Sequence, residues 1–148
     1  MAALVDTATD MQRLLSDASI QSDLCRLRTL CDAAERAACA AADADNFSER
    51  WTDNRDDDVS LPPHDAGGLS GFEVAILVLQ ADAEADAAKR AARECARIVK
   101  QSMTVRMRAM HQVEEYCDGI GGEIEAFITA ACWRQPSTHF DLWTGVDA

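Results

Sequence analysis

Apolar residues recur at helical spacing through most of the chain. From about residue 7 to residue 45 there is no glycine or proline, and the apolar side chains alternate in steps of three and four. These positions are Leu24, Leu27, Cys31, Ala34, Ala38 and Ala41. Because such steps keep side chains on one side of an α-helix, they predict an apolar helical face. The pattern leaves open whether this face belongs to one helix or to two.

Two further helical stretches follow from the same spacing. Ser70 and Glu73 have the arrangement of a capping box, which marks the start of a helix. Small residues then keep a seven-residue rhythm, at Val78, Ala81, Ala85, Ala88, Ala92, Cys95 and Val99. A third series continues through three glycines, which should weaken it locally, until Pro136 ends it. Its members are Met103, Met107, Met110, Val113, Cys117, Ile120, Ile124, Phe127 and Ala131.

Residues 46–70 interrupt the helical pattern. They hold acidic residues, a Pro-Pro pair and a Gly-Gly pair, which predict a long acidic connection with short irregular or strand segments. With 148 residues, seven glycines and three prolines, the chain suits one all-α domain over residues 1–148. Its first ten residues resemble neither a secretion signal nor a membrane span, so we expect no membrane partner and six reduced cysteines.

Charge is unevenly distributed. The formal net charge is −12, which speaks against a protein that binds nucleic acid over its whole surface. Half of the fourteen basic residues nevertheless lie between residues 89 and 108, where Glu94 is the one acid. They are Lys89, Arg90, Arg93, Arg97, Lys100, Arg106 and Arg108. Two interpretations stay open: an anion-binding site, or a solvated helix face of mixed charge.

Candidates for catalysis or metal binding are weak. His111, Glu114 and Glu115 share one helical turn and could ligate a metal, but a di-iron bundle would need a second such set. The cysteines form no C-x-x-C pair, and the G-I-G-G run at 119–122 lacks the pattern of a phosphate-binding loop. We therefore expect no enzyme activity, no catalytic residues, no metal and no cofactor.

Two short motifs carry a resemblance to a known family. The run N-F-S-E-R-W at 46–51 and the ending H-F-D-L-W-T-G at 139–145 resemble coat proteins of rod-shaped RNA viruses of the tobacco mosaic virus type. Cys25 and the stretch 67–90 stand in similar order. The resemblance implies an antiparallel four-helix bundle that assembles helically with itself around single-stranded RNA, found in the virion and the host cytoplasm.

The family comparison also implies roles for individual residues. RNA would bind between the third and fourth helices, where the basic segment falls. The residues expected to bind it follow from the charge of that segment and are Arg90, Arg93, Arg97, Lys100, Arg106 and Arg108. Four aromatic residues would form an outer core, namely Phe47, Trp51, Phe140 and Trp143. Glu49 and Asp82 would meet across a subunit contact, where repulsion between two ionised carboxylates favours assembly at low pH. The alternative is a soluble acidic helical-bundle adaptor that binds no nucleic acid.

Overall fold

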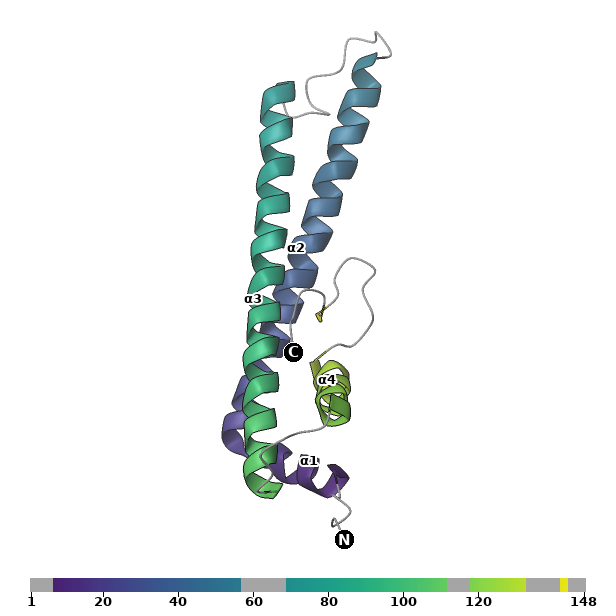
Figure 1. Ribbon diagram of the computed structural model, residues 1–148. Helices are drawn as coiled ribbons and strands as arrows, with labels where there is room; N and C mark the ends of the chain where they lie inside the picture. Colours follow the sequence, from purple (N-terminus) through teal and green to yellow (C-terminus); the bar gives the residue numbers. More distant parts are fainter. Residues whose placement is uncertain (1–6, 57–68, 112–117, 133–141, 144–148) are drawn as a thin grey trace.

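The chain folds into four α-helices (Figure 1). The structure is a computed structural model, and it describes residues 7–56, 69–111, 118–132 and 142–143. The helices are α1 (Thr7–Leu15), α2 (Ala18–Asp56), α3 (Gly71–His111) and α4 (Asp118–Cys132). The predicted all-α class is therefore confirmed, and no strand occurs within the described ranges.

A single aspartate divides the N-terminal helical stretch. Asp17 Oδ1 accepts hydrogen bonds from the backbone N–H groups of Ser19, at 2.9 Å, and Ile20, at 3.4 Å. A side-chain oxygen in this position satisfies N–H groups that have no partner inside the helix. Asp17 is therefore the N-cap of α2, and it fixes the break that the apolar pattern left unlocated.

The start of α3 confirms the predicted capping box. The Ser70 N–H donates to Glu73 Oε2 at 2.6 Å, and the Glu73 N–H donates to Ser70 Oγ at 3.3 Å. The two side chains thus satisfy each other's backbone donors at the helix entrance. This reciprocal pair explains why α3 begins at Gly71.

Two boundaries differ from the sequence-based prediction. The acidic connection was expected to begin at residue 46, whereas α2 continues to Asp56. A helix boundary was also expected before Met103, whereas α3 is continuous to His111. In both places the chain contains charged or polar residues but no glycine or proline, and solvent-facing charged residues are compatible with a helix. Residues 57–68 lie outside the described part.

The long helices α2 and α3 run antiparallel and side by side (Figure 1). They have 39 and 41 residues, so each is about 60 Å long. Midway along the pair both helices bury mainly alanine: Ala34, Ala38 and Ala41 in α2, and Ala85, Ala92 and Ala96 in α3. Small side chains allow two helix backbones to approach closely. We call these six residues the alanine interface.

Larger apolar side chains gather at the base of the hairpin, where α1 and α4 join the long helices (Figure 1). Each of the four helices contributes buried residues, among them Leu14, Leu27, Met103 and Ile124. The short helices α1 and α4, with nine and 15 residues, contact only part of the hairpin. The described residues therefore do not establish a four-helix bundle along the whole length of the hairpin.

Leu27→Ala should test the importance of this basal core. Leu27 is fully buried, so its truncation should lower the free energy of unfolding by about 2–5 kcal/mol. Urea denaturation followed by circular dichroism measures this loss. Leu77→Ala is the matched control, because Leu77 is 44% exposed and its truncation should cost less than half as much. Equal losses for the two variants would contradict the basal core.

Candidate nucleic-acid interface

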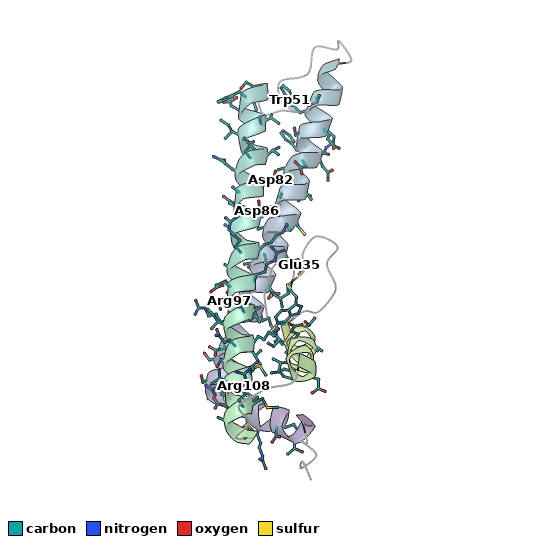
Figure 2. The ribbon with its side chains drawn as sticks, in the orientation of Figure 1. Glu35, Trp51, Asp82, Asp86, Arg97 and Arg108 are labelled. Atoms are coloured by element: carbon teal, nitrogen blue, oxygen red, sulfur yellow. The ribbon has the colours of Figure 1, made fainter. Side chains whose placement is uncertain are left out.

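The basic segment 89–108 lies wholly inside α3, not between two helices as the family resemblance implied. Arg90, Arg97 and Arg108 are exposed, whereas Arg93 is half-buried. Figure 2 shows Arg97 and Arg108 below Asp82 and Asp86 on the same helix, with Trp51 of α2 near the hairpin tip. Because α3 is continuous, these cations lie along one rigid helix.

Helical geometry places three exposed cations on a single line. Arg90 and Arg97 are seven residues apart, and Arg108 follows eleven residues later. With 3.6 residues per turn, these steps are close to two and three whole turns. The buried alanines and methionines of α3 occupy the opposite side of the helix. The line of guanidinium groups therefore points away from α2, toward solvent.

Arg97 is partly neutralised within its own helix. Its guanidinium forms an ion pair with Glu94 at 2.6 Å and donates a further hydrogen bond to Gln101 at 3.4 Å. The hydrogen bond from Arg97 lowers the pKa of Glu94, and the same contact raises the pKa of Arg97. Arg97 therefore remains a cation that a phosphate group could bind in place of Glu94.

Two other predicted RNA-binding residues have structural roles at the base. Lys100 is half-buried, forms an ion pair with Glu125 of α4, and lies 5.9 Å from the centre of the Trp143 ring. Arg106 binds Asp17 Oδ2 at 2.6 Å and Ser19 Oγ at 3.2 Å. The hydrogen bond from Arg106 is the largest cause of the lowered pKa of Asp17. Both cations thus tie α3 to neighbouring elements.

These partners were missed by the sequence interpretation. Arg106 was expected to bind RNA between two helices, but it lies in the last turns of α3 and contacts the α1–α2 corner. An aspartate that follows a serine before an apolar helix is a recognisable N-cap signal. That signal could have indicated the role of Asp17 as a cap, whereas its pairing with Arg106 depends on the tertiary fold.

Trp143 lies apart from Phe47 and Trp51, so these three predicted aromatic residues do not form one outer cluster. Trp143 Nε1 donates to Thr129 Oγ1 of α4 at 2.6 Å, and Trp143 packs against the basal core. Phe47 and Trp51 are half-buried in the part of α2 that leads to the tip (Figure 2). The expected packing of Trp143 with these two residues is therefore wrong, and Phe140 lies outside the described residues.

Glu49 and Asp82, the proposed inter-subunit carboxylates, are both exposed. Glu49 lies on α2 and Asp82 on α3, so each is accessible to another molecule. A contact between them across subunits stays a prediction, because one chain cannot display it.

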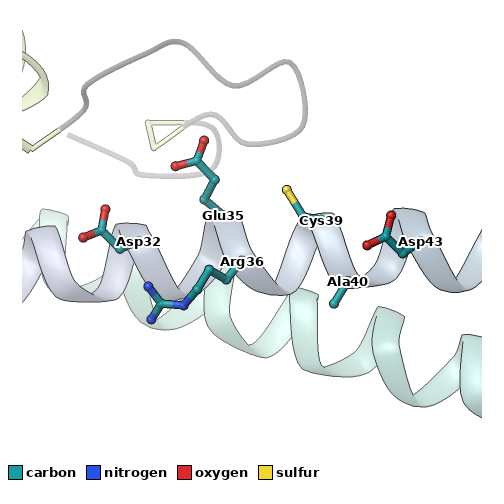
Figure 3. Close-up of a pocket in the computed structure, with 6 residues that line it drawn as sticks. All are labelled: Asp32, Glu35, Arg36, Cys39, Ala40 and Asp43. Atoms are coloured by element: carbon teal, nitrogen blue, oxygen red, sulfur yellow. The ribbon is translucent and has the colours of Figure 1, made fainter.

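The surface of α2 carries a shallow hollow of about 470 Å³ (Figure 3). It is lined by Asp32, Glu35, Arg36, Cys39, Ala40 and Asp43. All six come from one helix, so among the described residues no second element lines the hollow. Within the described ranges, no group of three or more His, Cys, Asp or Glu residues could hold a metal ion.

The cysteines differ in their surroundings. Cys31 and Cys132 are buried, whereas Cys25 and Cys39 are exposed, and all four are free thiols. Burial raises the pKa of Cys31 to about 12 and that of Cys132 to about 11. Since the thiolate is the reactive form, the two buried thiols should be inert near neutral pH.

No family model matches this sequence, and comparisons with curated proteins and with solved structures give no match. None of the described helices carries an apolar stretch suited to crossing a membrane.

Thiol labelling should separate these two classes of cysteine. In a short iodoacetamide pulse at pH 8, Cys25 and Cys39 should be alkylated at least tenfold faster than Cys31 and Cys132. A pKa of about 12 leaves Cys31 roughly one part in ten thousand ionised at that pH. Peptide mass spectrometry measures the rates, with guanidinium-unfolded protein as the control. Equal labelling of all four thiols in the folded protein would contradict the burial of Cys31 and Cys132.

Proposed function

We propose that this chain is a coat subunit that assembles helically with copies of itself around single-stranded RNA. The observation that carries the proposal is the line formed by Arg90, Arg97 and Arg108 on the outward side of α3. Phosphate groups bind arginine through charge and paired hydrogen bonds, largely without regard to sequence. A straight row of guanidinium groups on an acidic protein suits a ligand whose negative charges are spaced along its length.

The electrostatic setting of this row supports contact with phosphate. The ion pair between Arg97 and Glu94 is exposed, and such pairs contribute little and are screened by salt. Arg90 has no ion pair or hydrogen bond with another described residue. Phosphate could therefore engage Arg90 directly and Arg97 by exchange with Glu94, so binding should weaken steeply as salt rises.

A coat subunit must also assemble with copies of itself and have a suitable architecture. It rests on the sequence resemblance and on the long, thin hairpin, whose exposed sides are available to neighbouring molecules. The architecture that we propose is an antiparallel four-helix bundle at the base, where the basal core combines residues of α1, α2, α3 and α4. Such a subunit would act in the virion and, before assembly, in the host cytoplasm.

A second function, an acidic adaptor that binds proteins but not RNA, is favoured by one observation. Lys100 and Arg106 are held by carboxylates of their own chain, which reduces the number of cations available to phosphate. An adaptor would use the exposed apolar residues of α3 without needing Arg90 or Arg108. Salt-dependent RNA binding distinguishes the two functions.

Neutralising two exposed arginines should weaken RNA binding. For Arg90→Gln/Arg108→Gln, the slope of log K against log salt concentration should fall by about 1.4, since each lost phosphate contact on a single strand removes about 0.7. Fluorescence anisotropy with a labelled uridine oligonucleotide measures the slope at several salt concentrations. Arg36→Gln/Arg50→Gln removes the same charge from α2 and should leave the slope nearly unchanged. An unchanged slope in the α3 variant would remove RNA binding from this row.

A further inference from the structure

Four large apolar side chains are exposed on the outward side of α3. Phe72 is 75% exposed, Leu79 66%, Ile98 50% and Val105 57%. At 3.6 residues per turn, the four positions fall within an arc of about 100° on the side facing away from the alanine interface. Exposed apolar residues that share one face of a helix commonly mark an interaction site.

These four residues are symmetric about one point of the helix. Phe72 and Leu79 are one heptad apart, and so are Ile98 and Val105. The midpoint between Phe72 and Val105 lies between residues 88 and 89, and the midpoint between Leu79 and Ile98 lies at the same place. If a second α3 lay antiparallel across this point, each of the four residues would therefore lie level with an apolar residue of the other copy, on the opposite edge of the shared face.

Charge is also reversed across the same point. Asp82 and Asp86 precede it, and Arg90 and Arg93 follow it, all within an arc of about 80° along one edge of the exposed face. In an antiparallel two-fold pair the same edges of the two helices meet. The carboxylates of one copy would then lie within about 3 Å, measured along the axis, of positions facing the arginines of the other. The apolar and charged residues independently indicate one register.

We propose that two copies of this chain pair through the outward face of α3, antiparallel, around a two-fold axis between residues 88 and 89. Phe72 and Leu79 of each copy lie level with Val105 and Ile98 of the other, so the apolar residues of both copies share one contact. Asp82 and Asp86 of each copy pair with Arg93 and Arg90 of the other. The occupant is a second copy because its apolar and charged residues are complementary in a single alignment.

This pair goes beyond the proposed coat function. A two-fold interface is closed, so it cannot lengthen into a rod by itself. It also covers Arg90, which the proposed RNA row requires. The dimer is therefore the RNA-free form of the subunit, and single-stranded RNA should compete with the second copy for the same arginines.

Charge reversal tests both the surface and its register. Sedimentation of the nuclease-treated full chain at low salt should show a concentration-dependent dimer. Asp82→Lys/Asp86→Lys places cations opposite Arg90 and Arg93, and Arg90→Glu/Arg93→Glu places acids opposite Asp82 and Asp86. Each variant alone should raise the dimer dissociation constant at least tenfold. An equal mixture should form a mixed dimer, since every facing charge is then opposite.

Matched controls keep folding separate from association. Asp43→Lys/Asp45→Lys reverses two exposed acids of α2 and should leave the dimer intact, and circular dichroism verifies that each variant folds. A parent chain that is monomeric at all concentrations would overturn the proposal, as would a dimer that withstands both reversals or variants whose mixture stays monomeric. Dimerisation without RNA binding would contradict the coat function but not this dimer. RNA binding by a chain that stays monomeric would contradict this dimer but not the coat function.

Discussion

Close packing of alanines between α2 and α3 is the constraint on which the rest of the structure depends. The alanine interface lets the two long helices lie side by side, but small side chains bury little apolar area. Most stabilisation must therefore come from the larger residues at the base, where α1 and α4 complete the core. The hairpin beyond the base is a thin two-helix arm whose outer surfaces remain open to other molecules.

The same constraint determines where charged groups lie. Each helix gives one side to the interface and leaves the other to solvent, so the charge of that outer side is free to vary along the helix. On α3 it changes from acidic around Asp82 and Asp86 to basic around Arg90 and Arg97. This separation allows a protein of net charge −12 to present a cationic surface, and it also makes α3 complementary to its own antiparallel copy.

Periodicity predicted the helices well because buried positions must repeat. The apolar face from Leu24 to Ala41 is buried as expected, and the Ser70–Glu73 capping box forms. Helix ends at Asp56 and His111 were not predicted, since charged residues neither require nor prevent a helix there. Met110 also departs from the pattern, because it is 38% exposed near the end of α3.

The candidate site was predicted only in part. The basic residues of α3 could be identified before the structure was known, because their clustering is visible in the sequence itself. It could not show that Arg106 binds Asp17 or that Lys100 binds Glu125, because these partners are distant in sequence and meet only through the fold. The expected contact of Trp143 with Phe47 and Trp51 is wrong for the same reason, since Trp143 and Thr129 meet only through the fold.

Electron microscopy of negatively stained protein mixed with single-stranded RNA at low salt tests the central claim most directly. The coat function predicts rods or stacked discs of uniform width, with RNA inside that is protected from nuclease. Dispersed small particles, together with fully digested RNA, would contradict it.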